Sequence, residues 1–279
     1  MPATVHISSA WLIAASLSAL FVIVYPLVLA LIAHQRLKVS WRYFGFGALI
    51  FLLFQVVSRV PIVTVLGNLL APQLKASPLF LYIWLAFLAL TAGLAEEIGR
   101  YIGYRWLMKR EEKTWSKAVM YGLGHGGLES MLLIGGLIIL NIVNVVVLSS
   151  LNLNTLPAAQ HAQVVQQVNT LNAQPIWMVF LGSWERLWTV PFHVALSVIV
   201  LQVFVRNNIA WLWLAVVLHA LLDGVAVFLQ QILGAGTNAS LIIEGIIAVA
   251  GIASIWIIWR LRNSSETRTD TVVSDAALS

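Results

Sequence analysis

The segment LFLYIWLAFLALTAGLAEEIGRYIGYRW, residues 79–106, combines a long apolar run with charged groups inside its length. An α-helix of about 20 apolar residues crosses the hydrocarbon core of a bilayer, so this segment predicts a membrane-spanning helix. Glu96, Glu97 and Arg100 fall within it. Each ionisable group inside a membrane helix costs about 2.5–3.5 kcal/mol on insertion scales. Such groups therefore pair with one another, bind an ion or water, and by default mark a functional site.

The whole chain has the composition of a membrane protein. Of 279 residues, 60% are hydrophobic and 10% are charged, with a mean hydropathy of +0.91, whereas soluble domains carry about 25% charged residues. We predict an all-α, polytopic protein of the cell membrane with about seven transmembrane helices. Their expected ranges are residues 9–33, 43–70, 78–108, 117–148, 175–204, 209–232 and 238–261.

Charge and cysteine content exclude several other classes of protein. The net charge of +5 does not indicate nucleic-acid binding, because most basic residues lie in short loops between spans. Cys is absent, which excludes disulfides and cysteine-ligated metals. The first apolar run is longer than that of a cleaved signal peptide, so we expect it to remain as a span.

Basic residues alternate between successive loops, which predicts the orientation. The loops on one side contain Arg36, Lys38 and Arg42, then Lys109, Arg110, Lys113 and Lys117, then Arg206, and finally Arg260 and Arg262. On the other side, residues 149–174 and 233–237 carry no charge, and residues 71–77 carry only Lys75. Cytoplasmic loops of membrane proteins are enriched in Lys and Arg. We therefore expect an outside N-terminus and a cytoplasmic C-terminus.

The chain is expected to form one membrane domain over residues 1–262, without internal repeats. Residues 263–279 are polar and short of apolar groups, which predicts a disordered cytoplasmic tail. In the uncharged stretch 149–174, apolar residues recur at helical spacing, so we expect a short surface helix on the outer face.

Polar and ionisable groups recur on three further helices, at a depth similar to that of the acid pair. They are His125 and Glu129, then Glu185, Arg186 and His193, and finally His219 and Asp223. Counting about 1.5 Å per residue from the cytoplasmic ends, seven of the candidates lie roughly 12–21 Å inside a core of ~30 Å. These seven are Glu96, Glu97, His125, Glu129, His193, His219 and Asp223. Four helices that are polar at one level predict a shared cavity, which we expect to open toward the cytoplasm.

Spacing along each helix indicates which groups act together. His125 and Glu129, like His219 and Asp223, are four residues apart and so share a helical face. A lone buried histidine is usually a hydrogen-bond partner, but two histidines, each followed by a carboxylate, favour metal ligation or orientation of a water. One of Glu96 and Glu97 is expected to pair with Arg100, and the other, turned by about 100°, to face the cavity.

Several roles stay open at this point. Glu129 and Asp223 are either metal ligands or acceptors that orient a histidine. His193 is evenly balanced between the site and the scaffold, and Glu185 is expected to pair with Arg186. The candidate metal ligands are His125, His219, Glu129, Asp223 and His193, and the supporting residues are Arg100, Glu129 and His193.

Three motifs resemble those of the CAAX-protease and bacteriocin-processing superfamily, which includes the type II prenyl endopeptidases and the PrsW-like proteases. They are E-E-x-x-R (Glu96, Glu97, Arg100), Tyr-x-x-x-His (Tyr121, His125) and H-x-x-x-D (His219, Asp223). Within that superfamily, GLGHGGLES (residues 122–130) and the stretch from Trp184 to Ser197 are most similar to the YhfC family of glutamic-type or metal-dependent intramembrane proteases. The resemblance covers most of residues 90–230. It departs in the first motif, which commonly reads E-E-x-x-x-R.

The resemblance implies a role for each matched residue. Glu96 would activate the hydrolytic water, and Glu97 is the second glutamate of the pair. His125, His219 and Asp223 would hold the water and stabilise the oxyanion. These five residues are the predicted catalytic set.

We therefore predict an intramembrane endopeptidase. It would hydrolyse a peptide bond of a membrane protein or lipid-associated peptide within the bilayer, with water activated by a glutamate. Zn²⁺ is the candidate cofactor, and a metal-free mechanism stays open. The sequence does not set the oligomeric state. The alternatives are a metal-ion or proton transporter that uses the His-x-x-x-Glu and His-x-x-x-Asp pairs, and a non-catalytic membrane scaffold.

Overall fold

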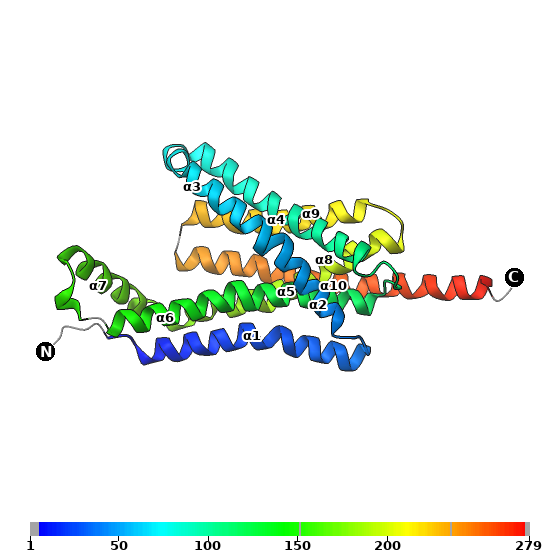
Figure 1. Ribbon diagram of the computed structural model, residues 1–279, viewed down its shortest axis with the longest axis horizontal. Coiled ribbons are helices and arrows are strands. Elements are labelled where there is room, and N and C mark those ends of the chain that lie inside the picture. The colour runs from blue at the N-terminus through cyan, green and yellow to red at the C-terminus, as the bar shows by residue number, and fades with distance from the viewer. Residues whose placement is uncertain (1–5, 151, 235, 277–279) are drawn as a thin grey trace. The chain divides into compact units, whose positions relative to one another are not determined.

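The structure is a computed structural model that describes residues 6–150, 152–234 and 236–276, with side chains described as far as residue 262. Within these ranges every element of secondary structure is helical (Figure 1). The α-helices are α1 (Ser9–Leu37), α2 (Arg42–Phe51), α3 (Val60–Ala76), α4 (Pro78–Trp106), α5 (Trp115–Glu129), α6 (Gly136–Ser150), α7 (Ala158–Ala173), α8 (Leu181–Val205), α9 (Ala210–Leu233) and α10 (Thr237–Ala276). The predicted all-α class is confirmed.

Among the described residues, seven helical stretches are long and apolar enough to cross a membrane, as predicted. They are Ser9–Leu37, Arg42–Ala76, Pro78–Trp106, Trp115–Ser150, Ile176–Val205, Ala210–Leu233 and Thr237–Arg262. Local signals explain several ends. α1 ends before Lys38 and α8 shortly before Asn207, both with a φ of +50° that no helix continues. α4 begins after Ser77, whose hydroxyl accepts the N–H of Phe80 at 3.3 Å.

Short helical segments of other pitch complete these spans. Two π-helical segments, η1 (Leu52–Arg59) and η2 (Ser130–Gly135), join α2 to α3 and α5 to α6, and two 3₁₀ segments, η3 (Leu153–Thr155) and η4 (Ile176–Phe180), flank α7. A π-helical segment changes the helical register and is frequent near functional sites. η2 begins directly after Glu129, so the polar face of α5 does not continue unchanged into α6.

The uncharged stretch 149–174 contains the expected short helix, α7. Val168 on this helix is buried in a cluster with Ile7, Trp11 and Val145. Burial of one apolar stripe explains why a helix so rich in Asn and Gln forms here. Residue 151 of this stretch lies outside the described residues, and the position of α7 on the outer face stays a prediction.

After the last span the backbone is described as helical to Ala276, and the disordered cytoplasmic tail over residues 263–279 stays a prediction. α10 continues to Ala276, through most of the polar tail that begins at residue 263. A helix extended from an existing turn avoids the unfavourable nucleation step, which accounts for its continuation into a polar sequence. Residues 277–279 of the tail lie outside the described residues.

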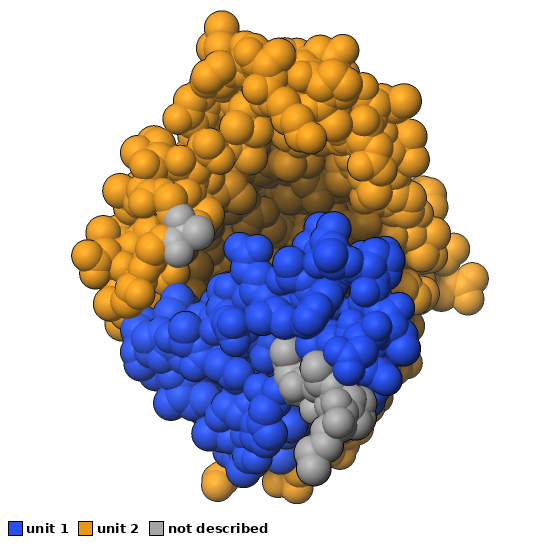
Figure 2. All heavy atoms as spheres, turned by 90° about the vertical axis from the view of Figure 1, so that its left-hand side faces the viewer, with its two compact units in different colours: residues 1–25, 130–186 blue, residues 26–129, 187–279 orange. Residues whose placement is uncertain are grey.

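Contacts divide the chain into two compact units, and the single membrane domain over residues 1–262 stays a prediction. Unit 1 comprises residues 1–25 and 130–186, and unit 2 comprises residues 26–129 and 187–279 (Figure 2). The predicted catalytic, supporting and metal-binding residues all fall in unit 2, which is therefore the unit that positions the site.

The interior of unit 2 is built around the second part of α8. From Val190 to Val203, nearly every residue of this helix is buried. A helix that is apolar and enclosed on all sides belongs to the centre of a bundle. Helices α4 and α9 lie side by side, as do α2 and α5 (Figure 1). His193 lies in the enclosed part of α8, so the sequence places an imidazole in the core of the unit.

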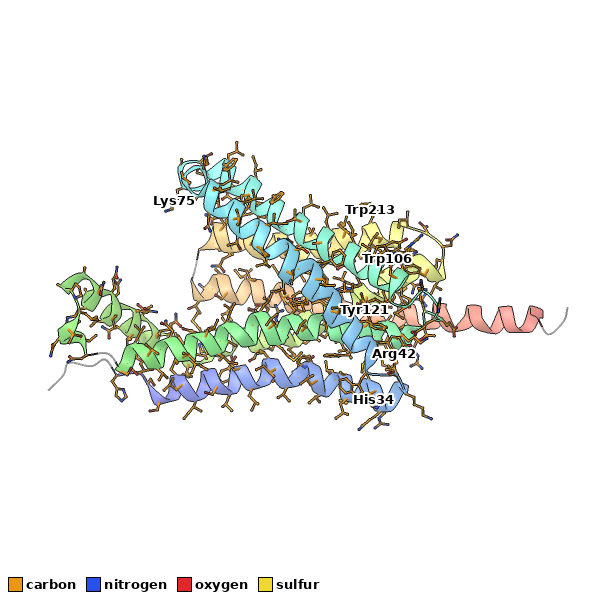
Figure 3. The ribbon with its side chains drawn as sticks, in the orientation of Figure 1. His34, Arg42, Lys75, Trp106, Tyr121 and Trp213 are labelled. Atoms are coloured by element: carbon orange, nitrogen blue, oxygen red, sulfur yellow. The ribbon has the colours of Figure 1, made fainter. Side chains whose placement is uncertain are left out.

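The two ends of unit 2 differ in charge. Lys75 lies at the turn between α3 and α4, and Arg42 lies at the opposite end, together with Trp106 (Figure 3). At that opposite end the side chains of Arg42 and Lys117 contact Glu111, with N–O distances of 2.7 and 3.8 Å. We call it the basic end of unit 2, because the loops with the most Lys and Arg lie there.

Candidate metal centre

Glycines on α5 set the position of His125 by allowing two other helices to approach closely. A Cβ added at Gly122 would lie 2.6 Å from Val194 Cα, and one at Gly126 would lie 2.8 Å from His193 Cβ, both on α8. Small residues permit such close helix packing in membranes. The spacing of Gly122 and Gly126, four residues apart, therefore holds α8 against one face of α5 and brings His193 beside His125.

A second close contact aligns α4 with α9. A Cβ on Gly93 would lie 2.7 Å from the carbonyl oxygen of Val216. Glu96 follows Gly93 by three residues, and His219 follows Val216 by three residues. The same Cβ would lie 3.1 Å from the backbone N of Ala220, which directly follows His219. The contact therefore brings the part of α4 that carries the acid pair beside His219.

Glu97 is the structural partner of Arg100, as the spacing predicted that one glutamate would be. Arg100 Nη1 donates to both carboxylate oxygens of Glu97 at 2.6 Å, and both side chains are fully buried. The Oε1 atom of Glu97 also lies 2.8 Å from His219 Nδ1. Because this carboxylate accepts from arginine and offers no proton, His219 donates through Nδ1 and leaves its Nε2 free to accept.

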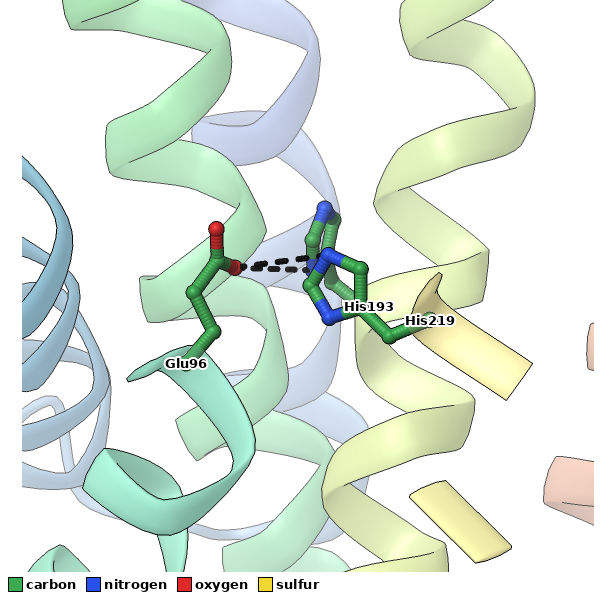
Figure 4. A group of neighbouring side chains, drawn as sticks. All are labelled: Glu96, His193 and His219. Atoms are coloured by element: carbon green, nitrogen blue, oxygen red, sulfur yellow. Dashed lines mark ion pairs between the residues drawn. The ribbon is translucent and has the colours of Figure 1, made fainter. Parts of the chain in front are cut away.

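Glu96 faces the cluster, and its Oε2 is the atom on which three histidines converge. His125 Nε2 lies 2.9 Å from it, His219 Nε2 lies 3.8 Å away, and His193 Nδ1 lies 4.0 Å away. Figure 4 shows Glu96 opposite the rings of His193 and His219. The predicted pairing of one glutamate with Arg100 is confirmed, and the other glutamate faces the three histidines.

The outer nitrogen of each histidine opposite Glu96 lies against a carboxylate oxygen. Glu97 holds His219 Nδ1 at 2.8 Å, and Glu129 holds His193 Nε2 at 2.7 Å. Metal-binding histidines in proteins typically donate their other N–H to a carboxylate, which fixes the tautomer and raises the basicity of the ligating nitrogen. Both histidines are thus set to present one unprotonated nitrogen toward Glu96.

The donor set fits a divalent metal. Glu96, His193 and His219 each offer one ligand atom, and these atoms lie within 4.8 Å of one another. His193 Nδ1 is buried and has no hydrogen-bond partner among the described residues, which a metal bond would satisfy. One carboxylate oxygen and two imidazole nitrogens are the donor types of catalytic zinc sites that keep an open position.

Asp223 lies at the edge of this group, and His125 lies behind it. Asp223 Oδ2 is 3.7 Å from His219 Nε2, and the side chain is 40% exposed, more than any other site residue. His125 is fully buried, and its Nε2 lies 2.9 Å from Glu96 Oε2, so it is placed to hold that carboxylate. Glu129 acts on His193 from outside the ligand set.

All eight predicted site and supporting residues meet in unit 2, and the Glu185–Arg186 pair forms separately in unit 1. Sequence reasoning missed two aromatic residues that pack against the histidines. Phe51 lies edge-on to His125 with ring centroids 5.1 Å apart, and Phe192 lies edge-on to His219 at 6.1 Å. No spacing rule identifies Phe51, because it comes from a different helix, whereas Phe192 precedes His193 directly in the sequence.

Comparisons with known proteins agree with this geometry. A family described as YhfC intramembrane metalloprotease matches residues 20–247 of the chain. The uncharacterized membrane protein YhfC of Bacillus subtilis (strain 168) is 28% identical over 249 residues, which cover 87% of this chain and 93% of that protein. No solved structure matches.

Proposed function

The chain belongs to the YhfC intramembrane metalloprotease family, and on that premise we propose that it hydrolyses a peptide bond of a membrane-embedded protein or lipid-associated peptide. In this proposal Glu96, His193 and His219 hold the metal ion, and zinc is the ion that suits them best. The observation that carries the proposal is the paired orientation of two histidines by Glu97 and Glu129, which leaves both free nitrogens directed at one oxygen of Glu96.

Residues of the chain divide the catalytic work. Zinc bound there would supply Lewis-acid polarisation of the scissile carbonyl. Asp223 is the most exposed carboxylate of the site. It accepts a proton from the attacking water while the oxygen of that water bonds to the carbonyl carbon. Asp223 then returns the proton to the amide nitrogen as the C–N bond breaks. This assignment gives Glu96 a ligating role in place of the proton transfer that the sequence suggested.

His125 and Arg100 act as positioning residues in this proposal. His125 Nε2 bonds to Glu96 Oε2 and so limits rotation of the ligating carboxylate. Arg100 neutralises Glu97, which keeps that carboxylate ionised and able to hold His219. Neither residue has to contact the substrate.

We also propose that the basic end of unit 2 lies in the cytoplasm, with the N-terminus outside and the C-terminus inside. The distribution of Lys and Arg among the loops supports this orientation. A transporter is less well supported than an enzyme, because Tyr104, Met108 and Tyr121 are fully buried between the site and the basic end. Ion transport needs polar groups along the whole path.

Metal content and cleavage, measured on the same purified variants, test the proposal. Substitutions His193→Ala and His219→Ala should lose bound zinc and cleavage together, while Asp223→Asn should keep its zinc and lose cleavage by roughly 10²–10⁴-fold. His161→Ala, on α7 and outside the cluster, is the matched control and should change neither. Cleavage is read from new N-termini in co-expressed membrane proteins, and elution as a single folded species is required of each variant.

Two results would contradict the proposal. Normal zinc content in both histidine variants would show that His193 and His219 do not hold the metal. Undiminished cleavage by Asp223→Asn would show that Asp223 is not the base. Loss of zinc in Asp223→Asn would make Asp223 a fourth ligand rather than the base.

A further inference from the structure

Exposure of the site's polar groups rises in one direction along unit 2. On α5, the side chain of His125 is 0% exposed, and that of Glu129, one turn later, is 16% exposed. On α9, the side chain of His219 is 4% exposed, and that of Asp223, one turn later, is 40% exposed. Both helices run away from the basic end, since α5 follows Lys113 and α9 follows Arg206. The site is thus most open on the side away from the basic loops.

Packing of α3, α4 and α9 changes in the same direction. On α9, residues Leu212, Ala215, Val216 and His219 are buried, and none of residues 220–233 is buried. On α4, burial begins only at Ala89, and α3 contains no buried residue. Asp223 therefore lies on the less enclosed side of the site.

The basic end of the site is closed by a layer of fully buried side chains. Tyr104 and Tyr121 stack with ring centroids 4.8 Å apart. The Tyr104 hydroxyl donates to the carbonyl of Ser197 at 3.0 Å, and the Tyr121 hydroxyl donates to that of Arg100 at 3.4 Å. Both phenols are therefore engaged by backbone groups of the unit itself. Beyond them, Lys113 Nζ donates to the carbonyl of Met108 at 3.2 Å, and partial burial lowers the pKa of Lys113.

We infer that water and substrate reach the metal centre from the end of unit 2 that lacks basic loops. This inference rests on the proposed function and on the orientation proposed with it. The substrate is then a membrane protein whose scissile bond lies in the extracytoplasmic half of its span, or directly outside the membrane on that side. The cytoplasmic opening expected from the sequence differs from this, because depth along a helix does not reveal which end the packing closes.

Cysteine accessibility tests the inference without any substrate, and the chain contains no native Cys. The probe is a charged maleimide that does not cross membranes, applied to right-side-out and to inverted vesicles. Ser77→Cys reports the end without basic loops, and Lys109→Cys reports the basic end. The test positions are Asp223→Cys and Ala226→Cys, which lie four and seven residues after His219. Ala118→Cys, seven residues before His125 and fully buried, is the matched closed position.

We expect Asp223→Cys and Ala226→Cys to be labelled from the side that labels Ser77→Cys, and Ala118→Cys to be labelled from neither side. Labelling of both test positions from the Lys109→Cys side, or from neither side, overturns the inference. Ala226→Cys leaves every proposed site residue in place. If Asp223→Cys fails to fold, Ala226→Cys therefore still tests the inference. Labelling requires no proteolysis, so a correct pattern without cleavage would overturn the proposed function alone.

Mapping of cleavage sites tests the substrate class. If cleavage occurs, the new N-termini should fall in the extracytoplasmic half of the substrate spans or just outside the membrane. Cuts confined to the cytoplasmic halves would contradict the inference while leaving proteolysis itself established.

Discussion

Glu97 holds His219 through a 2.8 Å contact between Oε1 and Nδ1, while the same carboxylate accepts Arg100 Nη1 at 2.6 Å on both oxygens. One buried anion thus neutralises a buried cation and orients an imidazole. Glu97 was grouped with the catalytic residues on the sequence, and that assignment stays a prediction; in the proposed function this fully buried carboxylate is a positioning residue.

Glu97→Gln should weaken both the fold and the metal centre. Removing one partner from a buried ion pair typically costs about 3–5 kcal/mol, because the other charge stays buried without compensation. Loss of a carboxylate behind a metal-binding histidine typically reduces metal affinity by about 10–100-fold. Thermal unfolding and zinc competition measure the two effects. Glu185→Gln, which breaks the partly exposed pair in unit 1, is the control and should leave zinc affinity unchanged. Unaltered stability of Glu97→Gln would contradict the role assigned to the pair.

Glu129→Gln should affect metal binding more selectively. Glu129 bonds to His193 Nε2 at 2.7 Å and is 16% exposed, so its loss leaves a weaker electrostatic penalty than the loss of fully buried Glu97. We expect zinc affinity to fall by about 10–100-fold, with a smaller decrease in unfolding temperature than in Glu97→Gln. Chelator competition on the purified variants distinguishes the two. Equal affinities of wild type and Glu129→Gln would show that Glu129 does not orient a ligand.

Two glycines of α2 make a sharp test of helix packing. A Cβ on Gly47 would overlap the backbone carbonyl of Tyr121, whereas one on Gly45 meets nothing within 4 Å. Gly47→Ala should destabilise the protein by at least ~1–3 kcal/mol, as overpacking does in well-packed interiors. Gly45→Ala should be neutral or stabilising by up to about 1 kcal/mol, because alanine is the better helix former. Folded yield and unfolding temperature provide the readout, and similar values for the two variants would argue against close packing of α2 on α5.

Removal of metal should destabilise the wild-type protein. A ligand that binds only the folded state at 100 times its dissociation constant adds about 2.7 kcal/mol of stability. A strong chelator should therefore lower the unfolding temperature, and added Zn²⁺ should restore it. His193→Ala should show no such response, because it lacks one of the three proposed ligands. If chelator shifted the variant as much as the wild type, metal would bind elsewhere.

Much of this arrangement was predictable from local sequence. Apolar runs predicted seven spans, because the length of a membrane helix is set by the thickness of the bilayer. The spacing of Glu97 and Arg100 predicted their pairing, since residues three apart are neighbours on a helix. The motif histidines were expected to meet because ionisable groups rarely face lipid.

Long-range geometry was not predictable from spacing. Glu129 was expected either to ligate a metal or to orient a histidine, and the sequence did not indicate that this histidine would be His193 on α8. His219 and Asp223 share a face, but the nearest carboxylate to His219 Nδ1 is Glu97 on α4. Such pairings depend on which helices pack together at the glycines. The sequence gives the positions of the glycines, but it does not reveal which helix packs against each one.

The three proposed ligands come from the third, fifth and sixth spans in chain order, on α4, α8 and α9. During synthesis, Glu96 enters the membrane long before His193 and His219 exist. The ion can therefore be captured only after six of the seven spans have left the ribosome. Until then the partners of the acid pair are Arg100 on the same helix, for Glu97, and His125 on the fourth span, for Glu96.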